Sequence, residues 1–280
     1  MQGLMILGTA SDVGKTMVQT LLCRYLANQG YKIAPFKSQN MTNFLVETKD
    51  NKYIARSQAL QAEAAKVEAI TEMNPIVLKI VENQQAEVIL HGEAVEIVSG
   101  RAYREKFYER GLEAISESLA VLEENYEMIL AEGAGSPVEL NLKDRELVNM
   151  KVAEMADLPA ILVADIDRGG VFASIIGTLA LLTEDERKRI KGIVINKFQG
   201  DASLFTDGKK WLEEETGLPV LGILPFISHQ IEPEDSLSEQ NKVQEVRETQ
   251  EDKYDEILRK FSPYIDLEQI EEIIKSWPRS

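Results

Sequence analysis

The sequence predicts an α/β fold built on a doubly wound, mostly parallel sheet. Short apolar runs alternate along the chain with segments whose apolar residues fall at helical spacing, as expected of a parallel sheet covered by helices on both faces. The first apolar run also leads through a glycine-containing turn into the first helical pattern. With 280 residues, 44% of them hydrophobic, the chain is long enough to bury one substantial core.

Each element can be placed from its own pattern. Strands are expected at residues 4–7, 32–36, 128–131, 160–164, 192–195 and 220–224. Apolar residues at helical spacing predict a first helix over residues 18–26, and Gly30 stands where a C-cap glycine would end it. Further helices are expected at residues 54–66, 101–123, 145–155, 171–182 and 203–216. Alternating apolar residues within 87–98 predict a small strand pair outside the main sheet.

Composition divides the chain into three parts. Residues 1–228 contain all six predicted strands and are expected to form the large domain. Residues 229–252 are polar and acid-rich and predict a linker, whereas residues 253–280 return to a helical pattern and predict a tail of two short helices.

Charge and cysteine content exclude several classes of function. Lysine and arginine number 31 against 47 aspartates and glutamates, a formal charge of −16, which disfavours binding to nucleic acid or to an anionic membrane. One cysteine, Cys23, excludes an internal disulfide, and with only His91 and His229 a Cys/His zinc cluster is excluded too. Cys23 is expected to be a structural thiol and both histidines to lie at the surface or in loops. Because neither a basic leader nor an apolar span of membrane length is present, we expect a cytoplasmic protein.

The strongest chemical signal lies between the first predicted strand and the first predicted helix. It is the segment Gly8-Thr-Ala-Ser-Asp-Val-Gly-Lys-Thr16, whose context is that of a phosphate loop binding ATP and Mg²⁺. Lys15, expected to be exposed in the loop, would reach the terminal phosphates and Thr16 would hold Mg²⁺. The alternative, a glycine-bearing turn with an incidental lysine, fits this context less well. The residues expected to contact the nucleotide are Gly8, Thr9, Ser11, Asp12, Val13, Gly14, Lys15 and Thr16.

Two further strand ends carry charged residues toward the same edge of the sheet. Lys37 follows the second predicted strand, and an extra cation is useful where a carboxylate meets ATP, because two anions are brought together. Glu132 ends the third predicted strand and precedes a glycine-rich turn, so it is placed to bind Mg²⁺ directly or through water. A solvated lysine and a turn-capping carboxylate are the alternatives for these two residues.

The fourth and fifth strand ends give weaker signals. Asp165 and Asp167 could bind metal, and Arg168 could clamp a phosphate or a carboxylate. An internal Asp–Arg ion pair explains the same residues equally well. Asn196 follows the fifth strand, and its amide could read the edge of an adenine ring.

These motifs together resemble the dethiobiotin synthetase type of P-loop NTPase, and within it the ATPase domain of the cobyric acid synthase family. The stretches that carry the second resemblance lie at residues 37–41, 73–75, 132–137, 148–150, 164–173, 195–198 and 234–237. The resemblance implies amidation of peripheral carboxylates of (adenosyl)cobyrinic acid a,c-diamide through acyl phosphates, in cobalamin biosynthesis. It implies a corrinoid substrate. It also implies that ammonia comes either from solution or from a separate glutaminase subunit. A homodimer is one candidate assembly.

The resemblance also distributes roles among the site residues. Catalytic roles are expected for Lys15, Lys37, Glu132 and Asp167, metal binding for Thr16, Glu132 and Asp165, and an adenine contact for Asn196. Substrate contacts are expected for Ser38, Gln39, Asn40, Ser136 and Arg168.

The family usually continues into a glutaminase domain with a cysteine nucleophile and a histidine base. No such domain follows in this sequence, and Cys23 lies inside the phosphate-binding unit, so we expect no glutaminase activity. Two other functions remain open: a dethiobiotin synthetase-like carboxylation and cyclisation, and a nucleotide-binding paralogue without turnover. A partitioning-type ATPase is disfavoured because residues 8–13 lack the additional lysine of that class.

Overall fold

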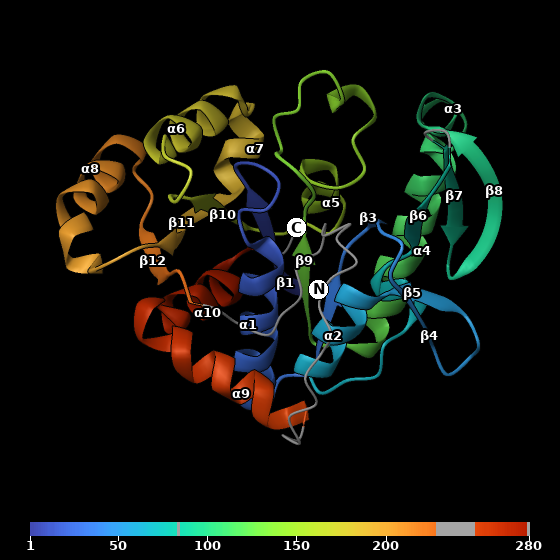
Figure 1. The fold of residues 1–280 in the computed structure, drawn as a ribbon, viewed down its shortest axis with the longest axis horizontal. Helices are drawn as coiled ribbons and strands as arrows, with labels where there is room; N and C mark the ends of the chain where they lie inside the picture. The colour runs from blue at the N-terminus through green and yellow to red at the C-terminus, as the bar shows by residue number, and fades with distance from the viewer. Residues whose placement is uncertain (83–84, 228–249, 279–280) are drawn as a thin grey trace.

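A six-stranded parallel sheet forms the centre of the computed structural model, which describes residues 1–82, 85–227 and 250–278 (Figure 1). Its strands lie in the order β12-β11-β10-β1-β9-β2, so β1 is an interior strand. All six predicted strands are confirmed, and so is the α/β fold class. The strands are β1 (Gln2–Gly8), β2 (Ile33–Phe36), β9 (Met128–Glu132), β10 (Ala160–Asp165), β11 (Ile190–Phe198) and β12 (Val220–Pro225).

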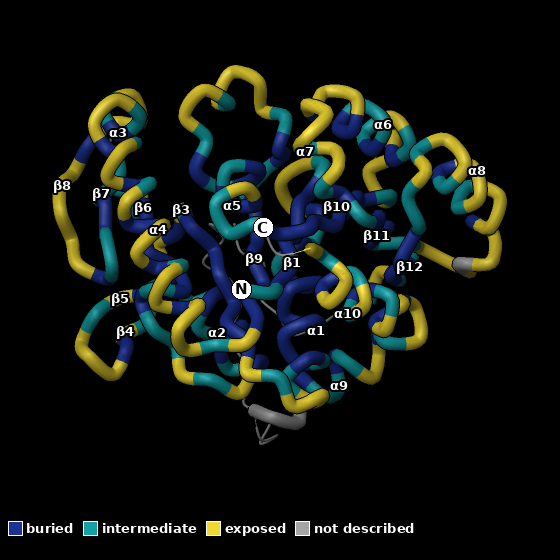
Figure 2. Tube along the Cα trace, turned by 180° about the vertical axis from the view of Figure 1, so that it is seen from behind, coloured by how far each residue is buried: buried dark blue, intermediate teal, exposed yellow. Residues whose placement is uncertain are grey.

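Helices cover both faces of this sheet because alternate strand residues point to opposite sides. On one face, Leu4 and Ile6 of β1 share a hydrophobic cluster with α1 (Lys15–Asn28), α9 (Gln250–Phe261) and α10 (Leu267–Ser276). On the other face, Met5 and Leu7 belong to a second cluster. The helices that contribute buried residues to it include α4 (Tyr108–Asn125), α5 (Met150–Met155), α6 (Val171–Leu181) and α8 (Thr206–Thr216). Figure 2 shows that the central strands and α1 are buried, whereas the outer helices carry the exposed residues.

A second, smaller sheet projects beside α3 (Gly100–Lys106) and α4 (Figure 1). Its strand order is β3-β6-β7-β8, with β3 (Gln39–Met41), β6 (Ile76–Val81), β7 (Gln85–Leu90) and β8 (Glu93–Ser99). The antiparallel pair β7–β8 confirms the strand pair predicted outside the main sheet, while β3 and β6 were not predicted. A two-stranded sheet of β4 (Leu45–Glu47) and β5 (Tyr53–Ala55) lies next to α2 (Arg56–Ala64).

Several helix boundaries differ from the predicted ones. The helix predicted over 101–123 is divided between α3 and α4 at Phe107, whose ring is buried and stacks on Tyr103. Of the helix predicted over 145–155, only α5 forms, because the carboxylate of Glu146 accepts hydrogen bonds from the backbone of residues 148, 149 and 151. The unpredicted helix α7 (Glu184–Arg189) begins with a capping box between Thr183 and Glu186.

The two helices predicted for the tail are present as α9 and α10, joined by a short 3₁₀ turn. They pack on α1 and on the sheet, where Tyr254, Phe261 and Ile270 join the cluster that contains Leu4. Helix α9 already begins at Gln250. Residues 229–249 of the predicted linker lie outside the described residues, together with His229 and the stretch 234–237. Among the described residues, no helix is long and apolar enough to cross a membrane.

Candidate active site

The predicted phosphate loop joins the end of β1 at Gly8 to the start of α1 at Lys15. Asp12 and Gly14 adopt left-handed backbone conformations, with φ of 57° and 98°, and Gly14 is the N-cap of α1. A Cβ atom at Gly14 would overlap the amide nitrogen of Asn196. The sequence therefore needs glycine here, and the N-terminus of a 14-residue helix faces the loop, as in sites that bind phosphate.

Lys15 is buried, which corrects the expectation of an exposed loop lysine: only 5% of its surface is accessible. Its Nζ atom donates to the carbonyl of Ala10 across the loop, over 3.2 Å. It also donates to the carbonyl of Gly135 in the turn after β9, over 3.3 Å. The ammonium group thus lies between the phosphate loop and the glycine-rich turn, where it can meet an anion bound by either.

Glu132 is the centre of the polar cluster at the strand ends. Its side chain is 1% exposed, and its Oε1 atom accepts a 2.7 Å hydrogen bond from the hydroxyl of Thr16. Lys37 Nζ lies 3.4 Å from the same oxygen, and Gln61 Nε2 donates to Oε2 over 3.0 Å. Sequence reasoning placed Thr16, Lys37 and Glu132 at one edge of the sheet, and the structure brings them into contact. It missed Gln61, a polar residue within α2 that no motif marks.

Thr16 and Glu132 offer oxygen atoms of the kind that Mg²⁺ prefers. Among the residues that the structure describes, no group of three or more histidine, cysteine, aspartate or glutamate side chains gathers at one point. Mg²⁺ usually keeps several waters and needs only one or two carboxylates beside the phosphates. The donor set present therefore fits Mg²⁺ bound together with a nucleotide.

Asp165 is held in an ion-pair network, the alternative that the sequence left open. Its Oδ2 atom lies 2.9 Å from Lys197 Nζ and 3.7 Å from Arg168 Nε. Lys197 also donates to the carbonyl of Asp12, so it ties the phosphate loop to the end of β10. Lys197 lies in the stretch 195–198 that carries the resemblance, but the sequence assigns it no role. The exposed Asp167 accepts from Gln199, and Arg168, 63% exposed, lies 3.5 Å from a carboxylate oxygen of Asp12.

Asn196 lies directly behind the phosphate loop. Its Nδ2 atom donates to the carbonyl of Val13 over 2.8 Å, and only 4% of the residue is exposed. One N–H of this amide is therefore engaged with the loop, so Asn196 supports the conformation of the loop from behind. Its contact with adenine stays a prediction.

The residues that follow Lys37 differ in what they are free to contact. Ser38 is fully buried and its hydroxyl donates to the carbonyl of Leu147 over 2.6 Å. Asn40 is also buried and donates to Ser57 and Gln58 of α2. Both side chains hold protein segments together, and their contact with substrate stays a prediction. Gln39 is half-buried and accepts a 2.5 Å hydrogen bond from the hydroxyl of Tyr103.

The glycine-rich turn after β9 is fixed by Asn149, which lies in the stretch 148–150 that carries the resemblance but to which the sequence assigns no role. The Nδ2 atom of Asn149 donates to the carbonyls of Ala134 and Ser136 over 2.8 and 3.2 Å. A Cβ atom at Gly133 would overlap its Oδ1 atom, so glycine is required for this close approach. The turn presents Ser136 beside a cavity of about 440 Å³.

Cys23 plays no part in this cluster. It lies in the apolar side of α1 and is fully buried, and this burial, reinforced by the charge of Glu132, raises the pKa of its thiol well above the ordinary value. The expectation of a structural thiol agrees with this placement. His91 lies in the turn between β7 and β8, with a φ of 45°.

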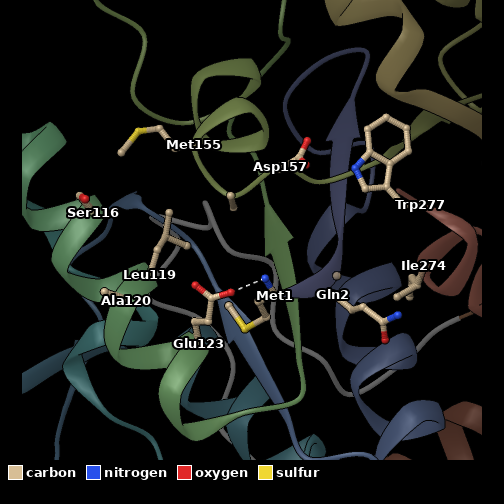
Figure 3. A pocket seen from close by; sticks show the side chains of 12 residues that line it. Met1, Gln2, Ser116, Leu119, Ala120, Glu123, Met155, Asp157, Ile274 and Trp277 are labelled. Carbon is tan, nitrogen blue, oxygen red and sulfur yellow. Dashed lines mark hydrogen bonds and ion pairs between the residues drawn. The ribbon is translucent and has the colours of Figure 1, made fainter. Parts of the chain in front are cut away.

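A different cavity, of about 340 Å³, lies at the opposite end of β1 (Figure 3). Met1 and Gln2 line it together with Leu119 of α4 and Trp277 after α10. The terminal amine of Met1 forms an ion pair with Glu123 there. None of the predicted site residues lines this cavity.

The chain is similar in sequence to known proteins. A family model described as an AAA domain matches residues 2–234. The chain is 52% identical over 235 residues to a cobyric acid synthase from Anoxybacillus flavithermus, covering 84% of this chain and 47% of that protein. It is 51% identical over 223 residues to a probable cobyric acid synthase from Methanothermobacter thermautotrophicus, covering 80% of this chain and 44% of that protein. The chain thus spans about half the length of these relatives.

Similar solved structures include chloroplast FtsY from Physcomitrella patens, with a TM-score of 0.45 and 13% sequence identity. That likeness covers 79% of this chain and 58% of the FtsY chain.

Proposed function

The chain belongs to the AAA domain family, and from this premise we propose that it is an ATP- and Mg²⁺-dependent amidoligase of the cobyric acid synthase type. The observation that carries the proposal is the contact of Thr16, Lys37 and Glu132 beside the phosphate loop. About 50% identity to cobyric acid synthases over four fifths of the chain supports the choice of reaction.

The proposed substrate is (adenosyl)cobyrinic acid a,c-diamide, whose peripheral carboxylates become amides. A carboxylate does not accept ammonia directly, because it is anionic and would have to expel oxide. Its oxygen therefore attacks the γ-phosphorus of ATP, which forms an acyl phosphate and releases ADP. Ammonia then attacks the acyl carbon, phosphate leaves with the C–O electron pair, and the nitrogen loses one proton.

The chain's own residues are suited to holding these anions. Backbone N–H groups of the loop and the N-terminus of α1 would bind the phosphates. Lys15 lies between the loop and the glycine-rich turn. Lys37 forms an ion pair with Glu132 over 3.4 Å and is buried, so its charge is poorly screened. Mg²⁺, held by Thr16 and Glu132, would neutralise charge on the transferred phosphoryl group.

No protein nucleophile is required for this reaction, because catalysis by positioning and electrostatics suffices for phosphoryl transfer. The ammonia would come from solution or from a separate glutaminase subunit. Cys23 is unsuited to releasing it from glutamine, since its thiol is buried and its pKa is raised.

The test is to incubate the chain with cobyrinic acid a,c-diamide, ATP, Mg²⁺ and ¹⁵N-labelled ammonium, and to follow the corrinoid by mass spectrometry. We expect ATP-dependent incorporation of ¹⁵N. The control is Lys188→Met, which removes an exposed lysine far from the loop in sequence. ATP hydrolysis without labelled corrinoid would reject amidation of this substrate and favour the dethiobiotin synthetase-like alternative. Intact nucleotide binding with neither hydrolysis nor labelled corrinoid would favour a paralogue without turnover.

A further inference from the structure

The cavity of about 440 Å³ lies between the small sheet, α3 and the long loop that joins β9 to α5. Its floor is apolar: Leu78 and Ile80 come from β6, Ala86 from β7 and Val98 from β8. These residues share one face of the small sheet, because Leu78 and Ile80 are two apart and Ile80 is paired with Ala86. An apolar cavity of this size is within the range that holds organic ligands.

Two separate connections join this cavity to the Glu132 cluster. The first is the glycine-rich turn: Gly135 accepts a hydrogen bond from Lys15, and the next two residues, Ser136 and Pro137, line the cavity. The second is the chain after β2: Lys37 contacts Glu132, and Gln39, two residues later, lines the cavity. A ligand in the cavity therefore lies next to the wall that holds the phosphate-loop lysine.

Cations outnumber acids in the lining, and two of the cations, Arg104 and Lys143, are each paired with an acid outside it, Asp144 and Glu186. Arg104, Lys143 and Arg145 line the cavity against two acids, Glu139 and Glu146, in a chain whose total charge is −16. The carboxylate of Glu146 is engaged with backbone N–H groups of its own loop. Arg145 donates to the carbonyl of Arg104, and Arg104 pairs with Asp144, so the guanidinium groups are fixed in place.

We infer that this cavity binds the apolar face of a large, flat ligand that carries several carboxylates at its edge. On the proposed function, on which this inference rests, that ligand is the corrin ring of the substrate. The apolar floor would receive part of the ring, and the cations would meet those peripheral carboxylates that are not reacting. The ring edge beside Ser136 would then carry one carboxylate past the turn toward Lys15 and Lys37.

The test fills the cavity without touching the nucleotide site. Ala86→Trp places an indole over the floor, and Ala94→Trp is the matched control, because Ala94 is exposed on the neighbouring strand β8 and does not line the cavity. Binding of cobyrinic acid a,c-diamide is measured without turnover by equilibrium dialysis, read by corrin absorbance. ATP binding and thermal unfolding are measured on the same preparations.

We expect Ala86→Trp to raise the Kd for the corrinoid by about tenfold or more, with ATP binding unchanged and with Ala94→Trp like the wild type. A second pair of variants is used if Ala86→Trp does not fold. Ile80→Glu adds a negative charge at a cavity residue that is 38% exposed, and Ile97→Glu adds it at a residue outside the cavity. Only the first of these should weaken binding.

Two results would contradict the inference, and they have different consequences for the proposed function. If the wild type and both cavity variants bind the corrinoid equally, the cavity assignment is wrong while the proposed function stands. If the wild type binds no corrinoid although it binds ATP, the proposed function and the cavity assignment fall together.

Discussion

The hydroxyl of Thr16 and the carboxylate of Glu132 meet over 2.7 Å, although 116 residues separate them in the sequence. One belongs to the first turn of α1 and the other ends β9, and the parallel pairing of β1 with β9 brings them together. Lys37 and Gln61 hold the same carboxylate from other directions. The fold thus brings the two proposed Mg²⁺ ligands together.

Glu132→Gln should raise the Mg²⁺ concentration needed for half-maximal ATP hydrolysis by about tenfold or more, because it removes ligand charge at nearly constant volume. Nucleotide binding should change much less. Gln61→Met is the control, since it removes one hydrogen bond to the carboxylate and keeps its charge. An Mg²⁺ titration that is the same for Glu132→Gln and the wild type would assign Glu132 a structural role.

Lys15→Met should reduce ATP-dependent turnover by about 10²–10³-fold, because it removes a preorganised charge opposite the phosphates. Burial of Lys15 adds a second expectation. The carbonyls of Ala10 and Gly135 lose this donor, so the free energy of unfolding should also fall, by about 1–2 kcal/mol. Turnover and urea unfolding are measured beside Lys188→Met. Turnover close to the wild-type rate would refute the phosphate-loop assignment.

Gly14→Ala and Gly170→Ala separate steric overlap from backbone strain. Both glycines are left-handed N-caps, of α1 and α6, so alanine costs about 1–2 kcal/mol in either case. Only at Gly14 would the new Cβ atom overlap Asn196, because no atom lies within 4 Å of the Cβ position at Gly170. Gly14→Ala should therefore lose nucleotide binding, measured by calorimetry, while Gly170→Ala keeps it. Equal nucleotide affinity in the two variants would show that the loop tolerates the displacement of Asn196.

Asp255 links α9 to α1 in a pH-dependent way. Its two carboxylate oxygens accept from Arg24 over 2.8 and 2.6 Å, and this hydrogen bonding lowers the pKa of Asp255 from its ordinary 3.8 to about 2. Because the folded-state pKa is depressed, the stabilisation is present above pH 3.8 and is lost as the pH falls through about 2.

Asp255→Asn should accordingly lower the free energy of unfolding at pH 7 by about 2 kcal/mol at most, since Asp255 is partly exposed and water screens the pair. The difference from the wild type should shrink between pH 4 and pH 2. Urea unfolding across that range is the measurement, with the exposed Glu256→Gln as control. A difference that does not vary with pH would show that packing rather than charge secures α9.

The 280-residue chain should not hydrolyse glutamine, and Cys23→Ser should leave its activity unchanged. Burial raises the pKa of the Cys23 thiol, so the reactive thiolate is not formed near neutral pH. If the proposed function holds, ammonium salts should support amidation. The rate should rise between about pH 8 and pH 9, because the fraction of unprotonated ammonia grows. Stoichiometric release of glutamate from glutamine, coupled to ATP hydrolysis, would contradict this prediction.

The sequence predicts the central sheet well because its strands are buried on both faces and read as apolar runs. The strand ends could also be predicted to meet, since parallel strands present their carboxyl ends at one edge, and this placed Lys37 and Glu132 together. Gln61 was missed, and Asn149 and Lys197 were marked only as members of the stretches 148–150 and 195–198. Their roles depend on tertiary contacts, which leave no periodic pattern in the sequence. The break at Phe107 was missed for the same reason: the helical pattern continues, and core packing interrupts it.

The interior position of β1 also governs the order in which the chain can fold. Gln2 pairs with Met128 and Met5 with Ala160, so both neighbours of β1 are synthesised more than a hundred residues after it. The next main-sheet strand, β2, offers no earlier partner, because β9 lies between it and β1. At ribosomal rates of about 5–20 residues per second, β9 is synthesised on the order of ten seconds after β1. During that time the apolar residues of β1 have no partner strand in the main sheet. Substitutions that weaken β9 should therefore lower the yield of native protein during synthesis more than they lower the stability of the finished molecule.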